Sequence, residues 1–138
     1  MPHAVFEPAP PLEEFWRGFT PFKVVGPDRA ILEARASFLR QDQQAVVIEA
    51  LALEIGPPQH FFVICDRRGE RVTVRCAPLV PVARTDGVME IVRQIAAQFR
   101  ESGGTVLRTN LDLDVPIVPA VSFGRPDPSE SPAEDPDE

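Results

Sequence analysis

Residues 30–115 carry a regular pattern of apolar and polar side chains, and its first part has the period of a β-strand. Between positions 32 and 38 the even-numbered residues are Leu, Ala, Ala and Phe, whereas the odd-numbered ones are Glu, Arg and Ser. A period of two places each set on one side of an extended chain, so we predict a strand over residues 30–40 with the even positions facing the core. A helix is the alternative, because Ala, Leu, Glu and Arg favour helices and Asp28 is able to cap one.

Residues 45–55 have apolar side chains at both even and odd positions. A strand covered on both faces has this composition, and so does a buried helix. Polar residues 41–44 precede the segment and Gly56 follows it with two prolines, as is typical of hairpin connections. We therefore interpret it as a central strand.

Residues 60–65 and 71–76 form the clearest local signal, a hairpin closed by residues 66–70. Gly69 is able to take the positive φ that tight hairpin turns require. We expect the turn to set Cys65 opposite or diagonal to Val72, about 13 Å from Cys76 and outside disulfide reach. Both thiols are then small core residues.

Two helices and one more strand complete the pattern. The apolar stripe of residues 11–19 predicts a short helix, and a longer stripe predicts a helix that begins at Thr85 or Asp86 and ends at Gly103. The stripe of this second helix consists of Val88, Ile91, Val92, Ile95 and Phe99. Residues 105–115 alternate again and predict a half-exposed strand.

These elements predict an α+β fold of order α-β-β-β-β-α-β. We expect an antiparallel four- to five-stranded meander, with a short N-terminal helix and one long helix packed on one face. The pairing of the last strand stays open. Residues 1–10 and 124–138 are rich in proline and predicted to be disordered, which leaves one domain over residues 11–123.

Charge and composition exclude several classes of protein. The formal net charge is −7, and residues 125–138 contribute six acids against one Arg, so the body of the chain is nearly neutral. We therefore expect no nucleic-acid partner, because phosphate recognition needs a basic surface. No segment has the length of a membrane helix, and the proline-rich start is no signal peptide. The two cysteines and an Arg-rich, Lys-poor composition indicate a bacterial, cytoplasmic protein with reduced thiols.

Residues for catalysis are scarce. The chain has two histidines, His3 and His60, and no phosphate loop, dinucleotide fingerprint or zinc spacing. Asp112 and Asp114 lie on one side of the last predicted strand, but Arg108 on the same side opposes a cation. We expect no cofactor and no metal, and a non-enzymatic role is favoured.

Four arginines, Arg67, Arg68, Arg71 and Arg75, gather within nine residues of the hairpin. Such a patch holds carboxylates or phosphates, or it is a charged strand face that discourages edge pairing. The acidic C-terminal tail is a further candidate to bind this group of arginines.

The first hairpin strand, with Phe61 and Phe62, is apolar on both sides, so one side needs a cover. The first functional hypothesis is an adaptor- or chaperone-like module that binds a protein partner, or a second copy as a homodimer, through a sheet edge or this apolar hairpin face. The alternative is a small-molecule or anion-binding domain, or an enzyme, with a helix–sheet pocket lined by Arg71 and Arg75.

Overall fold

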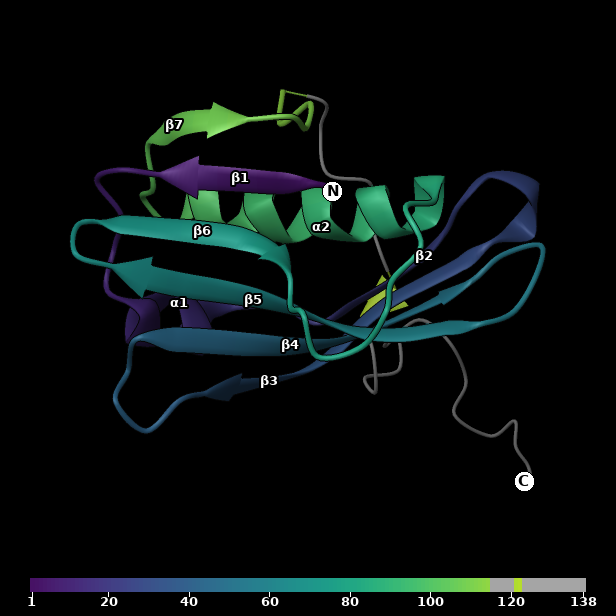
Figure 1. Cartoon of the computed structure of the whole chain (residues 1–138), viewed down its shortest axis with the longest axis horizontal. Coiled ribbons are helices and arrows are strands. Elements are labelled where there is room, and N and C mark those ends of the chain that lie inside the picture. The colour runs from purple at the N-terminus through teal and green to yellow at the C-terminus, as the bar shows by residue number, and fades with distance from the viewer. Residues whose placement is uncertain (115–120, 123–138) are drawn as a thin grey trace.

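The computed structural model describes residues 1–114 and 121–122, which form a curled antiparallel sheet with two helices on its inner face (Figure 1). The sheet contains eight strands in the order β7-β1-β6-β5-β4-β3-β2-β8. The strands are β1 (His3–Phe6), β2 (Phe22–Val25), β3 (Ile31–Leu39), β4 (Ala45–Leu53), β5 (Gln59–Arg68), β6 (Arg71–Cys76), β7 (Val106–Thr109) and β8 (Val121–Ser122). The helices are α1 (Leu12–Gly18) and α2 (Asp86–Glu101), and a short 3₁₀ turn, η1 (Pro27–Arg29), joins β2 to β3.

The α+β class and the antiparallel sheet are confirmed, but the four- to five-stranded meander is wrong. Strands β3 to β6 do form a meander, and the structure adds β2 and β8 on one side of it and β1 and β7 on the other. The strands missed by the sequence prediction are two to four residues long. A strand this short has no readable period, because it is stabilised by its neighbours in the sheet rather than by its own pattern.

The expected disorder of residues 1–10 is wrong, because these residues contain β1, which is also too short to have a readable period. Strand β1 pairs antiparallel with β6 and β7, so it lies inside the sheet. The Ala4 and Phe6 side chains are fully buried, and the ring of Phe6 lies 4.8 Å from that of Phe99 on α2. The prolines on either side of β1 mark the ends of the strand and do not prevent it from forming. The predicted tail, residues 124–138, lies outside the described residues.

A β-bulge in β3 reverses the predicted orientation of its second half. The register with β4 shifts between Ala34 and Ser37, so Leu39 packs against the core and Phe38 points outward, 57% exposed. The prediction that Ala36 and Phe38 share the core face with Ala34 is therefore wrong. One inserted residue inverts every later side chain in a strand whose period is two.

The last predicted strand is also shorter than expected. Strand β7 ends at Thr109, after which Leu111 and Leu113 are buried while Leu107, on β7, is 44% exposed. The side chain of Asn110 accepts a hydrogen bond from His3 N and donates one to Met1 O, which ties this turn to the start of the chain. Val115 lies outside the described residues.

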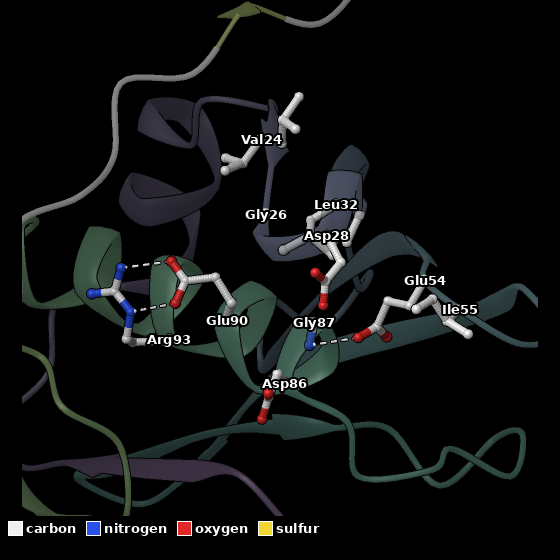
Figure 2. A pocket seen from close by; sticks show the side chains of 12 residues that line it. Val24, Gly26, Asp28, Leu32, Glu54, Ile55, Asp86, Gly87, Glu90 and Arg93 are labelled. Carbon is white, nitrogen blue, oxygen red and sulfur yellow. Dashed lines mark hydrogen bonds and ion pairs between the residues drawn. The ribbon is translucent and has the colours of Figure 1, made fainter.

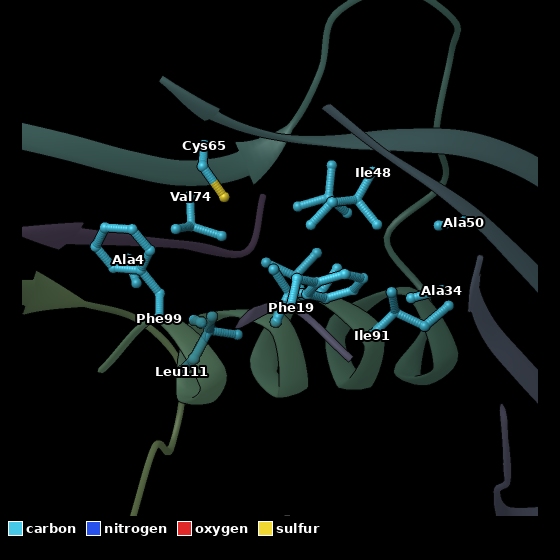
Figure 3. Packing of buried hydrophobic residues seen from close by; sticks show 14 of the residues in the cluster. Ala4, Phe19, Ala34, Ile48, Ala50, Cys65, Val74, Ile91, Phe99 and Leu111 are labelled. Carbon is cyan, nitrogen blue, oxygen red and sulfur yellow. The ribbon is translucent and has the colours of Figure 1, made fainter. Parts of the chain in front are cut away.

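The apolar stripe of α2 forms the centre of the core, as the sequence predicted. Thr85 is the N-cap and its hydroxyl accepts a hydrogen bond from Val88 N, while Ile91, Ile95 and Phe99 are fully buried. Figure 3 shows Cys65, Val74 and Ile48 of the sheet turned toward Ile91 and Phe99 of the helix. Helix α1 adds Phe15, whose ring lies 5.0 Å from that of Phe99.

The β5–β6 hairpin has a different register from the predicted one. Arg68 pairs with Arg71, so the turn consists of Gly69 and Glu70, with the φ of Gly69 at 62°. Cys65 is then opposite Val74, and Cys76 is opposite Val63. The two cysteines are diagonal neighbours on one face rather than about 13 Å apart. Both are free thiols, and burial raises the pKa of Cys65.

Among the described residues, no helix combines the length and the apolar composition needed to cross a membrane.

The buried position of β1 predicts a large effect of Phe6→Ala. Removing this ring leaves a cavity against Phe99, so we expect the free energy of unfolding in urea to fall by about 3–5 kcal/mol. Phe38→Ala is the matched control, because its ring is more than half exposed and its loss costs less than about 1 kcal/mol. Equal losses in the two variants would show that β1 is not part of the folded core.

Candidate functional site

The face of the sheet opposite the helices, called the outer face here, is covered by neither α1 nor α2 (Figure 1). Register pairs across five strands align one row of outward side chains on it, namely Phe38, Val47, Ile64, Arg75 and His3. Phe62 lies beside this row and is half-buried, as are Val47 and Ile64. The outer face therefore has an apolar half over β3, β4 and β5, interrupted by Glu49 opposite Phe62, and a cationic half over β6 and beyond.

The two phenylalanines of the predicted site separate onto opposite faces. Phe61 points into the core and is 1% exposed, whereas Phe62 points outward. The helices thus cover Phe61 and Val63 and leave Phe62 and Ile64 on the outer face. The side of β5 that the helices cover is therefore the side of Phe61.

The four predicted arginines separate in the same way. Arg67 lies on the inner side of the hairpin, opposite Val72, and donates hydrogen bonds to the carbonyl oxygens of Ala9, Pro10 and Gly69. It is a structural residue that holds the segment between β1 and α1. Arg68, Arg71 and Arg75 lie on the outer face.

Arg108 on β7 joins these three and completes a group that we call the arginine corner: Arg68, Arg71, Arg75 and Arg108. Arg71 pairs with Glu7 at 2.7 Å and Arg68 with Asp66 at 3.7 Å. No carboxylate of the described residues pairs with Arg75 or Arg108. Sequence reasoning missed Arg108 because only β1, which lies between β6 and β7, brings it near Arg75.

Two hollows of about 700 and 460 Å³ lie at the arginine corner. Both are lined by Val5, Thr73, Arg75 and Arg108. The hydroxyl of Thr73 and two guanidinium groups without a carboxylate partner suit an acidic group of a ligand or partner. The predicted helix–sheet pocket lined by Arg71 and Arg75 is not formed, because these side chains lie on the face away from both helices.

A different pocket of about 590 Å³ does lie between helix and sheet, where the N-terminus of α2 meets the ends of β2, β3 and β4 (Figure 2). We call it the end pocket. Its lining residues are Val24, Val25, Gly26, Asp28, Ala30, Leu32, Glu54, Ile55, Asp86, Gly87, Glu90 and Arg93. The sequence had no local signal for it, since its walls come from four separate segments.

Glu54 holds the start of α2 in the end pocket. Its carboxylate accepts hydrogen bonds from Thr85 Oγ1 at 2.6 Å and from Gly87 N at 3.0 Å. A carboxylate is stabilised at this place because the first N–H groups of a helix lack internal partners and carry partial positive charge. Residue 87 must be small, because an added Cβ would lie 2.6 Å from Glu54 Cδ and 2.7 Å from Leu32 Cδ2.

Glu90 is the second organised carboxylate of the end pocket. Arg93 donates to it through Nε at 2.8 Å and Nη2 at 2.7 Å, and Gln94 Nε2 donates at 2.8 Å. Burial alone would raise the pKa of Glu90, but these hydrogen bonds outweigh it and hold the pKa below its ordinary value of 4.5.

Metal binding finds no support in this arrangement. In residues 1–114 and 121–122, no three or more His, Cys, Asp or Glu side chains gather closely enough to hold a metal ion. Asp114 pairs instead with Arg100 at 3.1 Å.

The sequence matches no known protein-family model, and comparisons with curated proteins and with solved structures find no similar protein. Function has therefore to be argued from the two surfaces described above.

The tight packing at residue 87 predicts that Gly87→Ala is destabilising. The new methyl group has to displace Glu54 from the helix start or move the buried Leu32, so the free energy of unfolding should fall by about 1–3 kcal/mol. Gly18→Ala is the control, since no atom lies within 4 Å of its added Cβ and we expect a change within about 0.5 kcal/mol. Similar results for both variants would contradict the packing around Glu54.

The lowered pKa of Glu90 predicts a pH-dependent effect of Glu90→Gln. A carboxyl group whose pKa is lower in the folded than in the unfolded chain stabilises the fold fully above the unfolded value, near 4.5, and loses this contribution as pH falls through the folded value. The variant should therefore be less stable than the wild type at pH 7, by about 1 kcal/mol or less because the group is partly solvated, and the difference should shrink as the pH falls below the unfolded pKa.

Urea unfolding across this pH range measures the difference, with Glu14→Gln on α1 as the reference for the loss of one exposed carboxylate. A difference between wild type and Glu90→Gln that grows as the pH is lowered would contradict the assigned hydrogen bonds.

Proposed function

We propose that this protein is a non-enzymatic module that binds an acidic protein partner through the outer face of its sheet. The observation that carries the proposal is the row of Phe38, Val47 and Ile64, which faces solvent directly beside the arginine corner. An apolar patch bordered by charge is typical of protein-binding surfaces.

The apolar half supplies the affinity in this proposal. Phe38 is 57% exposed, and Val47, Phe62 and Ile64 retain part of their exposure on three adjacent strands. Full burial of a side chain of this size contributes about 1.5–3 kcal/mol. Because these four side chains are already partly buried, each contributes less than this to the free energy of binding. A partner that covers them needs an apolar centre of matching size.

The cationic half supplies the specificity. Arg75 and Arg108 have no carboxylate partner in the described part of the chain, and Arg68 and Arg71 are paired only at the surface. A partner with carboxylates at this end gains charge-assisted hydrogen bonds, whereas a basic partner is repelled. This favours an acidic protein.

Other partners fit the surface less well. Within the described residues, the strands at the two ends of the sheet, β7 and β8, span four and two residues, which offers little length for pairing with another strand. A second copy would press two convex faces together and bring two arginine corners into one interface. The face, rather than an edge or a homodimer contact, is therefore the preferred surface.

We also propose a bacterial cytoplasm as the compartment. Support comes from Cys65 and Cys76, which are free although they are diagonal neighbours on one face of the hairpin, and from the Arg-rich composition.

A photo-crosslinking amino acid at position 38 tests the proposal in cells of the source organism, with the same group at position 14 on α1 as the control. We expect position 38 to capture one acidic protein that position 14 does not. With that protein purified, Arg75→Glu combined with Arg108→Glu should weaken binding on the order of tenfold at physiological salt, without loss of stability. Arg29→Glu, a single exposed reversal in η1, should change it little.

Capture of a second copy at position 38 would make the outer face a dimer interface and overturn the proposal. So would capture from both positions alike, no capture at all, or a captured partner whose affinity ignores the two arginines.

A further inference from the structure

The end pocket has the size and walls of a small-molecule site. Its volume of about 590 Å³ falls within the range of roughly 300–1,000 Å³ that such sites occupy. The floor is apolar and well packed, since Val24, Ala30 and Leu32 are 5%, 7% and 1% exposed. It lies on the helix side of the sheet and shares no residue with the arginine corner.

Two large apolar side chains lie at the rim of the end pocket and are largely exposed to solvent. Ile55 is 89% exposed and Val25 is 68% exposed, the two highest values among the exposed large apolar residues of the described chain. Both line the pocket. A ligand with an apolar body that rises from the floor to the rim would cover them, which is a stronger reason for a ligand than the hollow alone.

The charges around the end pocket define the ligand further. Four carboxylates line it, those of Asp28, Glu54, Asp86 and Glu90, against the single guanidinium of Arg93. Figure 2 shows Asp28 pointing from η1 toward the start of α2 at Gly87, with Asp86 on the far side of that first turn. Asp28 and Asp86 are exposed, and the structure gives their side chains no hydrogen-bond donor or cation among the described residues.

The N–H groups at the start of a helix usually favour anions, but those at the start of α2 already donate to groups of the protein itself. Gly87 N donates to Glu54, and Val88 N donates to Thr85. Glu90 holds Arg93 in the same way, so the one cation of the pocket is neutralised within it. An anionic ligand would meet four carboxylates and few free donors.

We propose that the end pocket binds a small organic cation, an amine or ammonium compound with an apolar body. The apolar part lies on Val24, Ala30 and Leu32 and covers Val25 and Ile55 at the rim. The ammonium group lies at the carboxylate of Asp28, close to the start of α2, where it offsets the negative charge of the four carboxylates that line the pocket. This binding is independent of a protein partner on the outer face.

Three probes with the same phenyl body separate the contributions: 2-phenylethylammonium, the neutral 2-phenylethanol and the anionic 3-phenylpropanoate. Each is titrated into ¹⁵N-labelled full-length protein, and the amide shifts of residues 24–32 and 86–90 are followed. We expect the cation to shift these amides with saturation, the alcohol to bind the same residues more weakly, and the propanoate to cause no shift there.

Variants then assign the two halves of the pocket. Asp28→Asn and Asp86→Asn should each weaken the cation by roughly 2- to 5-fold and leave the alcohol unchanged, because only the charged probe uses the carboxylates. Ile55→Ser should weaken both probes, since it removes rim contact, and its exposed position keeps the fold intact. Glu101→Gln, an exposed acid of α2 outside the pocket, should change neither.

Equal affinity for the cation and the alcohol, insensitivity of the cation to both Asp variants, shifts confined to other residues, or no shift at 10 mM probe would each overturn the assignment. These results leave the protein-binding proposal untouched, because its variants lie on the opposite face of the sheet.

Discussion

The structure depends on the need to bury the apolar stripe of α2. That stripe runs the length of a sixteen-residue helix, with Val88, Ile91, Ile95 and Phe99 fully excluded from water. The meander of β3 to β6 packs on part of this stripe, and the flanking strands add further apolar surface to the core. Strand β1 contributes Phe6 and Ala4, and β2 contributes Phe22 and Val24, so the sheet widens and curls around the helix.

Both candidate surfaces are consequences of this one-sided burial. Because α1 and α2 lie inside the curl, neither helix covers the outer face, and side chains such as Phe62 and Ile64 remain partly exposed there. Because the helix begins at the end of the curled sheet, its first turn lies against the ends of β2, β3 and β4. Glu54 caps the helix at this junction, and the space beside it is the end pocket.

Much of the local structure was predictable from the residues alone. The stripe and cap of α2, the four strands of the meander and the turn at Gly69 each depend on neighbours in sequence. Apart from the register of the β5–β6 hairpin, which is a local error, the errors involve partners distant in sequence. The bulge in β3 inverts Phe38 because β4 sets the register, and β1 is ordered because β6 and β7 pair with it. Of the four arginines grouped in the sequence, Arg67 turns inward to the carbonyl groups that precede α1, whereas the other three lie on the outer face.

The sequence by itself determined which segments are amphipathic, where α2 starts and stops, and that a cluster of arginines accompanies an apolar hairpin. Only the tertiary structure decided which side of that hairpin faces solvent, that Arg108 joins Arg75, and that four acids from three separate segments line one pocket. The physical reason is that the side-chain period of a helix or strand is a local property. The choice of which face is covered depends instead on pairing across the whole sheet, where short strands such as β1 and β7 derive their stability from neighbours that their own residues do not specify.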